Sequence, residues 1–252
     1  MKVIPLSEGV FTIDQSRKFV PFNTSSDVLA ERSRGSLLVE VQPFVVVTSR
    51  DVLLLDSGLG HAGADGILQL HQNLVDAGID PFDITKVLLT HLHKDHAGGL
   101  SIHDAIMDRW TWSFPHATHY VQARELEYAF QQGSPSYILE ELSMLRDSDR
   151  VVLLEGEGDI DGYIHHTPSG GHCPFHQVFH VRENGETLFF GGDEAPQLHQ
   201  MKSRFMAKYD HDGKRAMELR QQWMAQGQAE GWTFLFYHDI KTPTWKANDR
   251  HD

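Results

Sequence analysis

The stretch Thr90-His91-Leu92-His93-Lys94-Asp95-His96-Ala97-Gly98-Gly99 decides how this sequence is interpreted. Three imidazoles and one carboxylate lie within the six residues from His91 to His96. Side chains alternate along an extended backbone, so His91 and His93 are expected to point to the same side. Asp95 and His96 follow where the chain turns, and they can face a second point nearby. Because crowded titratable groups concentrate at functional sites, the cluster predicts a site that can serve two metal ions.

The residues on either side of this cluster place it at the end of a strand. The apolar run at 86–90 is typical of a buried strand. Gly98 and Gly99 have no side chains, so the backbone there can pack closely against the site, and we expect a short helix to begin at this point. The expected order is therefore strand, site loop and helix.

Strands and helices alternate along the rest of the chain. The expected strands are 9–13, 36–41, 44–48, 52–56, 151–154, 177–181, 187–190 and 233–237. The expected helices are 65–77, 122–145 with an interruption at 133–135, and 214–228. We expect a bend or bulge at Pro43, and a type I′ hairpin at Asn184-Gly185 because both of its turn positions need a positive φ. Two similar halves of this kind predict an α/β fold in which two sheets lie between helices.

Length and composition are those of an ordinary globular protein. With 252 residues, of which 40% are hydrophobic and 23% charged, the chain can build a large core, and we expect one domain over 1–252. The 17 histidines are many for this length, and imidazole is the commonest metal ligand. His71, His103 and His251 have no ligand-like neighbours and are expected at the surface.

The charge balance bears on partners. The 35 acidic and 22 basic residues give a formal charge of −13, which repels nucleic acid, and the basic pair Arg32 and Arg34 is too small to offset it. A small-molecule substrate is expected instead. No stretch approaches the roughly 20 apolar residues of a membrane span. The single cysteine, Cys173, excludes an intrachain disulfide, and the apolar run at the N-terminus is far shorter than a signal-peptide core, so a cytoplasmic location is the default expectation.

The motif His91-x-His93-x-Asp95-His96 resembles the signature of the metallo-β-lactamase superfamily. Further segments along most of the chain are similar to motifs of that family: Leu55-Asp56-Ser57-Gly58, Thr167-Pro168-Ser169-Gly170-Gly171-His172-Cys173-Pro174-Phe175-His176, Phe190-Gly191-Gly192-Asp193 and Phe236-Tyr237-His238-Asp239. The segment from Thr167 to His176 carries two additional residues before its first histidine. The resemblance implies a four-layer αβ/βα sandwich with two mixed sheets flanked by helices.

The resemblance also implies two divalent metal ions, with zinc as the first expectation and manganese, iron or cobalt also compatible with nitrogen and oxygen ligands. The implied ligands of one metal are His91, His93 and His172; those of the other are Asp95, His96 and His238; and Asp193 bridges both. Asp56 and His176 are expected behind the ligands, where they would orient them. For Asp56 a helix or turn cap is an alternative, and for Cys173 the role of a small buried hydrophobe is favoured over metal ligation.

The charge of such a site favours hydrolysis. Two divalent cations, two aspartates and one hydroxide leave about +1, which stabilises a developing oxyanion. A hydroxide bound by both metals is the expected nucleophile. Asp95 could orient it and pass its proton to the leaving group. The expected function is therefore hydrolysis of a small ester, lactone or related acyl compound.

Two alternatives of other classes stay open: a phosphodiesterase of the same fold, and a persulfide dioxygenase-like oxidoreductase with a single iron. Within the family, Asp193 argues against antibiotic hydrolysis, because true β-lactamases generally lack that residue, and His93 argues against the flavin-coupled diiron branch. The lactonase interpretation gains from His238-Asp239, whereas Pro196 stands where the best-known lactonases carry a tyrosine. Thioesterases of the glyoxalase II kind carry a basic C-terminal region that is not evident here.

Several further residues are candidates for the pocket or for the core. Tyr237 and His176 are candidates for contacting substrate. For the aromatic residues Trp110, Trp112, Phe114, Phe19 and Phe22 a place in the core is favoured, since large rings usually anchor packing. Lys94 is expected to point into solvent. The segment 19–34 is a candidate arm for a homodimer.

Overall fold

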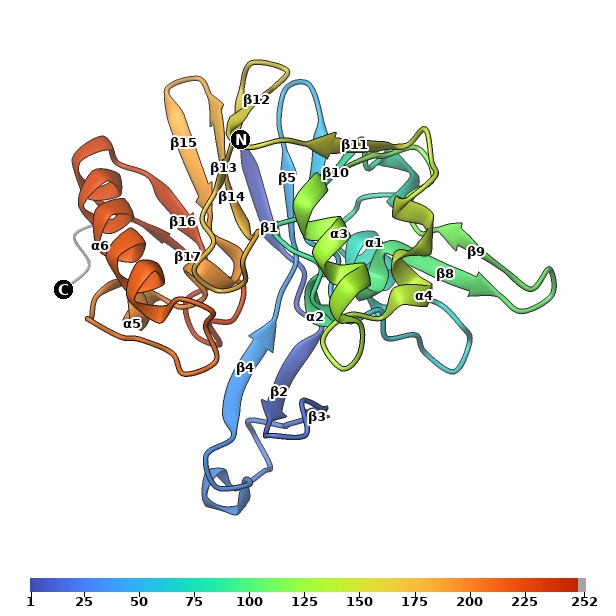
Figure 1. The fold of residues 1–252 in the computed structure, drawn as a ribbon, viewed down its shortest axis with the longest axis horizontal. Coiled ribbons are helices and arrows are strands. Elements are labelled where there is room, and N and C mark those ends of the chain that lie inside the picture. Colours follow the sequence, from blue (N-terminus) through green and yellow to red (C-terminus); the bar gives the residue numbers. More distant parts are fainter. Residues whose placement is uncertain (249–252) are drawn as a thin grey trace.

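The computed structural model describes residues 1–248, and its core is a pair of six-stranded sheets (Figure 1). The first sheet has the order β1 (Lys2–Pro5), β5 (Phe44–Val47), β6 (Val52–Leu55), β7 (Lys86–Leu88), β10 (Thr118–Gln122) and β11 (Val151–Leu154). The second has the order β12 (Gly158–Ile160), β13 (Ile164–Pro168), β14 (Gln177–Glu183), β15 (Glu186–Phe190), β16 (Thr233–Leu235) and β17 (Thr244–Lys246). Each sheet contains both parallel and antiparallel pairs, so the predicted mixed sheets are confirmed.

Helices cover the outer face of each sheet. On the first sheet these are α1 (Gln69–Asp76), α3 (Ala123–Gln132) and α4 (Leu139–Leu142); on the second they are α5 (Leu198–Met201) and α6 (Gly213–Glu230) (Figure 1). One buried cluster, with Phe44, Phe179 and Phe190 at its centre, lies between the sheets, and two others lie between the sheets and their helices. Burial of apolar side chains in three successive interfaces holds the four layers together, and the predicted α/β sandwich is confirmed.

A three-stranded sheet extends from this body as an arm, made of β3 (Phe19–Pro21), β2 (Gly9–Ile13) and β4 (Leu37–Val41) (Figure 1). Pro43 lies between β4 and β5, where the chain leaves the arm and enters the first large sheet, so the predicted bend is confirmed. The segment 19–34 contains β3 and the 3₁₀ turn Leu29–Glu31 of this arm. That it mediates a homodimer stays a prediction.

The expected elements occur with shifted ends. The helix expected at 65–77 begins only at Gln69, because Leu68 pairs with Ala62 in a β-bridge and Gly66 has a φ of 78°. The interruption at 133–135 separates α3 from α4, as predicted. Asn184 and Gly185 have φ of 52° and 79°, which confirms the hairpin turn.

Several elements were not predicted: β1, β3, β10, β12, β13, β17 and the hairpin of β8 (Ser101–Asp104) and β9 (Arg109–Trp112). His103 is exposed, as expected, whereas His71 is half-buried because its ring packs on Phe114, 5.3 Å between centroids. His251 lies outside the described residues. None of the helices within 1–248 is both long and apolar enough to cross a membrane.

Candidate metal centre

Loops that follow strands of both sheets converge at one edge of the sandwich. The first sheet contributes His91, His93, Asp95 and His96, which lie after β7 and in the short helix α2 (Lys94–Ala97). The second sheet contributes His172 from the loop between β13 and β14, Asp193 after β15 and His238 after β16. The structure thus brings together all seven residues proposed as ligands.

The first group consists of His91, His93, His172 and Asp193, whose candidate ligand atoms all lie within 4.8 Å of one another. His93 Nδ1 lies 3.0 Å from His91 Nε2 and 3.2 Å from His172 Nε2. Asp193 Oδ2 lies 3.2 Å from His172 Nε2. Three imidazole nitrogens and one carboxylate oxygen therefore face a common point.

The second group consists of Asp95, His96 and His238. Asp95 Oδ2 lies 3.6 Å from Nε2 of both histidines. The other oxygen of Asp193, Oδ1, lies 3.1 Å from His96 Nε2 and 2.9 Å from His238 Nε2. Asp193 thus turns one oxygen to each group, which is the arrangement that a bridging ligand requires.

These residues fit divalent metal ions. His96 Nε2 and Asp193 Oδ1 are buried, and neither atom makes a hydrogen bond within the described residues. Buried polar atoms rarely lack a partner, and such atoms facing each other across a small gap are expected where an ion binds. Imidazole nitrogens with carboxylates are the ligands that zinc and similar metals prefer.

The electrostatics of the site agree with this fit. Burial, together with the positive charge of neighbouring histidines, holds the pKa of His91 and His93 well below the ordinary value. Both rings are therefore neutral near pH 7, and each keeps a lone pair available for a metal. Burial also acts to lower the pKa of His96 and His238, but Asp193 and Asp95 outweigh it and raise the pKa of both rings.

Asp56 lies directly behind the site, where it is fully buried at the end of β6 with a φ of 55°. Its Oδ1 accepts a hydrogen bond from the Thr90 backbone N–H, and its Oδ2 accepts one from Thr90 Oγ1, both at 2.8 Å. Oδ2 also lies 2.8 Å from His96 Nδ1. The carboxylate therefore connects the strand end to the ligand loop and orients the His96 ring; it caps no helix.

His176 is buried beside the ligands rather than in the pocket. Its ring centroid lies 4.9 Å from that of His91, and its Nδ1 lies 2.9 Å from Ser169 Oγ. Cys173 lines the pocket, but its thiol lies 3.6 Å from Glu125 Oε2 and belongs to neither ligand group.

Three residues that support the candidate ligands were not predicted from the sequence. Glu194 Oε2 accepts hydrogen bonds from the backbone N–H groups of Gly171 and His172, both at 3.1 Å. Asp210 Oδ1 lies 3.1 Å from His172 Nδ1, and the Glu40 carbonyl oxygen lies 2.5 Å from His238 Nδ1. No spacing rule links these residues to the ligands they hold, although Glu194 directly follows Asp193.

Gly98 and Gly99 allow the close approach that was predicted for them. A Cβ atom on Gly99 would lie 2.1 Å from the Ser57 carbonyl oxygen, and one on Gly98 would lie 2.5 Å from the Leu59 carbonyl oxygen. The segment from 57 to 59 therefore packs against the loop that carries the ligands. The helix expected to begin at these glycines begins earlier, at Lys94, and a 3₁₀ turn follows at Gly98–Leu100.

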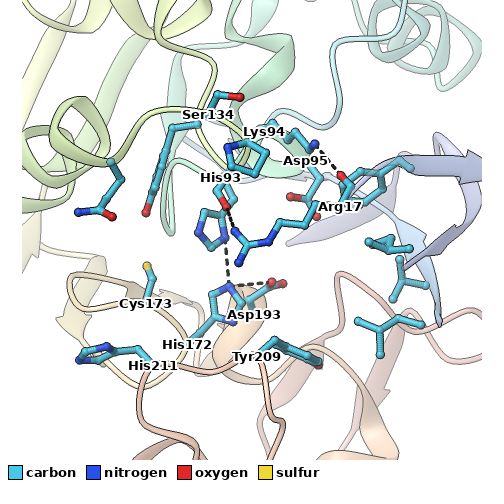
Figure 2. A pocket seen from close by; sticks show the side chains of 18 of the residues that line it. Arg17, His93, Lys94, Asp95, Ser134, His172, Cys173, Asp193, Tyr209 and His211 are labelled. Atoms are coloured by element: carbon cyan, nitrogen blue, oxygen red, sulfur yellow. Dashed lines mark hydrogen bonds and ion pairs between the residues drawn. The ribbon is translucent and has the colours of Figure 1, made fainter. Parts of the chain in front are cut away.

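A cavity of about 430 Å³ opens onto the two groups (Figure 2). The arm lines one side of it, and the loop from Gly133 to Tyr137 lines another. Phe19 also lines the cavity, whereas Phe114 is buried in the core behind the first sheet.

Two expectations about this cavity were wrong. Lys94 is half-buried on the cavity wall, because its Nζ donates to the Arg17 carbonyl oxygen at 2.7 Å. Tyr237 is fully buried beneath the site and does not line the cavity. Its ring stacks on His96, with 4.1 Å between centroids, and its hydroxyl donates to the Asp95 carbonyl oxygen at 2.5 Å.

Comparisons with known proteins point in one direction. A family model described as the metallo-beta-lactamase superfamily matches residues 39–221. An N-acyl homoserine lactonase AttM of Azorhizobium caulinodans is 37% identical over 115 residues, covering 42% of this chain and 38% of its own length. The AttM of Agrobacterium fabrum is 33% identical over 147 residues, covering 52% and 51%. The chain thus spans about half or less of the length of these curated relatives.

Solved structures share the fold. A probable metal-dependent hydrolase from Staphylococcus aureus superposes with a TM-score of 0.79 at 22% identity, covering 99% of this chain and 93% of that one. AidC, described as a dizinc quorum-quenching lactonase, superposes with a TM-score of 0.73 at 16% identity, covering 96% and 88%.

Proposed function

The chain belongs to the metallo-β-lactamase superfamily, and on this premise we propose that it is a metal-dependent hydrolase of a small lactone or a related ester. The observation that carries the proposal is the pair of ligand groups that share Asp193, one oxygen to each. The relatives named as lactonases support the choice of a lactone.

We propose that His91, His93 and His172 hold one divalent ion, that Asp95, His96 and His238 hold the other, and that Asp193 bridges them. Zinc is the ion we propose first, which the donor set supports. Two such ions would lower the pKa of a water molecule toward neutrality, so that hydroxide is available, and would polarise the carbonyl group of the substrate.

The residues of the chain supply positioning and proton transfer. Asp95 is well placed to carry a proton, because it lines the cavity and its backbone carbonyl is held by Tyr237. We propose that its carboxylate orients the attacking water and delivers a proton to the leaving oxygen as the ester bond breaks. The apolar side chains of Ile13, Leu37 and Val39 on the arm offer a wall for the acyl part of the substrate.

We further propose that residues 1–252 form a single hydrolase domain. Each ligand group takes residues from loops of both sheets, so neither half of the chain could form the site alone.

The test is a substrate panel on the zinc-loaded protein, with γ-lactones, thioesters and phosphodiesters. We expect lactone hydrolysis without oxygen consumption, and a loss of about 100-fold or more in kcat for Asp95→Asn, as for removal of a general acid or base. Asp149→Asn, at an exposed turn that does not line the cavity, serves as the matched control and should retain activity. Equal rates for wild type and Asp95→Asn, or consumption of oxygen by an iron-loaded protein with no hydrolysis, would contradict the proposal.

A further inference from the structure

The tip of the arm places a cation over the cavity. The turn between β2 and β3 is held by Asp14, whose Oδ1 accepts a hydrogen bond from the Ser16 N–H at 2.8 Å and whose carbonyl accepts one from the Arg17 N–H at 3.0 Å. Arg17 itself has a φ of 55°, a left-handed conformation that is uncommon for a residue with a side chain. Figure 2 shows its side chain extending from the arm across the cavity toward His93.

Two contacts with the body hold Arg17 in this position. Its Nη1 donates to Ser136 Oγ at 2.6 Å, and its carbonyl oxygen accepts from Lys94 Nζ at 2.7 Å. Ser136 in turn accepts a hydrogen bond at its carbonyl oxygen from the Lys94 backbone N–H, at 2.9 Å. The arm tip, the 133–137 loop and the start of α2 are thus joined, which sets the position of the guanidinium relative to the ligand groups.

The cavity wall carries two cationic side chains, although the chain as a whole is acidic. The chain carries a formal charge of −13, yet the cavity wall holds Arg17 and Lys94. Neither forms an ion pair with a carboxylate within residues 1–248. The acidic residues that line the cavity, Asp95 and Asp193, both belong to the candidate ligand groups. A guanidinium has five donors in a planar fork, and Ser136 occupies only one nitrogen, so the remaining donors can bind a planar anion.

From this geometry we infer that Arg17 is a specificity-determining residue, which binds a carboxylate on the substrate while the lactone or ester group lies at the ligand groups. The inference rests on the proposed function and narrows its substrate class to acyl compounds that carry a carboxylate near the bond that is hydrolysed. Such a compound is drawn to the cavity by the positive charge of Arg17 and Lys94, although the chain as a whole has a formal charge of −13. Lys94 supports this role indirectly, because its amino group holds the Arg17 backbone.

Two matched lactones test the inference: 5-oxotetrahydrofuran-2-carboxylate and its neutral carboxamide. Wild type should prefer the carboxylate. Arg17→Gln should lower kcat/KM for the carboxylate by about 10- to 100-fold, the usual effect of losing hydrogen bonds to a charged group, and for the carboxamide by less than about threefold. Arg17→Lys keeps the charge without the fork and should fall between the two proteins.

Two control variants separate binding from positioning. Lys18→Gln removes the charge next to Arg17 in the same turn. Lys18 does not line the cavity, so this variant should leave kcat/KM for both lactones unchanged. Ser136→Ala removes the partner that positions the guanidinium but leaves its charge, so the carboxylate should lose only part of the kcat/KM that Arg17→Gln removes, and the carboxamide should change little. Equal losses on both lactones in Arg17→Gln, or no preference in wild type, would overturn the inference.

A binding measurement distinguishes failure of the proposed hydrolytic function from failure of the inference about Arg17. Calorimetry with 2-hydroxyglutarate, the product of the acidic lactone, on the zinc-loaded protein should show weaker binding to Arg17→Gln by the same factor. If neither lactone is hydrolysed but this difference is found, the proposed function fails and the role of Arg17 stands. If lactones are hydrolysed and the difference is absent, the inference about Arg17 fails alone.

Discussion

Replacement of Asp56 by asparagine should weaken one metal site and spare the other. The carboxylate makes three contacts of 2.8 Å, two with Thr90 and one with His96 Nδ1. Asparagine keeps the size of the side chain and tolerates the left-handed backbone at this position. However, an amide has a single acceptor oxygen. Its NH₂ group must therefore face a donor at one of two places, either the Thr90 N–H or the pair formed by His96 Nδ1 and Thr90 Oγ1.

The magnitude follows from these contacts. Loss of at least one hydrogen bond to a charged group removes about 1.5–3 kcal/mol, and loss of a residue that orients a metal ligand typically costs about 10- to 100-fold in metal affinity. His96 belongs to the group with Asp95 and His238, so the loss should fall on that site. The other site, built on His91, His93 and His172, should change by less than about threefold.

The assay is a competitive zinc titration against a chromophoric chelator, fitted for two sites. Asp210→Asn is the matched variant, since Asp210 stands behind His172 Nδ1 as Asp56 stands behind His96 Nδ1. It should weaken the site of His91, His93 and His172 and spare the site of Asp95, His96 and His238. The reasoning is refuted if Asp56→Asn leaves both affinities unchanged, or if the two variants weaken the same site.

Three further predictions concern stability. Gly99→Ala should lower the free energy of unfolding by about 1–3 kcal/mol, because the new methyl would meet the Ser57 carbonyl oxygen; an unchanged midpoint of urea unfolding would contradict this. His119 is buried, and burial lowers its pKa to about 4 from an ordinary value of 6.5. Between these pH values the unfolded chain therefore binds a proton at this histidine that the folded chain does not bind. From pH 6.5 to 4 the free energy of unfolding of wild type should fall by about 3 kcal/mol more than that of His119→Gln. Parallel pH profiles of the two proteins in urea unfolding would argue against it. Chelation of the metals should lower the Tm, since an ion that binds only the native state stabilises it by about 2.7 kcal/mol at a concentration of 100 times its Kd; a Tm that is insensitive to chelator would be the contrary result.

The sequence was most informative where the chemistry is local. The spacing of His91, His93, Asp95 and His96 indicates a two-site cluster by itself, because neighbours along a short loop are also neighbours in space. Some larger elements were predictable for a related reason: the apolar periodicity of α1 and the turn at Asn184-Gly185 are local signals. The strands β12 and β13 were missed because most of their residues, Gly-Asp-Ile and Ile-His-His-Thr-Pro, are not apolar, whereas the strands that were predicted are apolar runs.

Other features could not be predicted because they depend on residues far apart in the chain. Lys94 is drawn onto the cavity wall by Arg17, which lies 77 positions earlier. Tyr237 is turned away from the substrate side because its hydroxyl meets the Asp95 carbonyl, 142 positions earlier. Glu194 and Asp210 likewise reach His172 across 22 and 38 positions, when the loops of the second half come together.

Anomalous diffraction from crystals of the zinc-loaded protein tests the two-ion centre most directly. We predict two peaks per chain, one among His91, His93 and His172 and one among Asp95, His96 and His238, with an oxygen of Asp193 next to each. A single peak, or a second one remote from Asp193, would contradict the account.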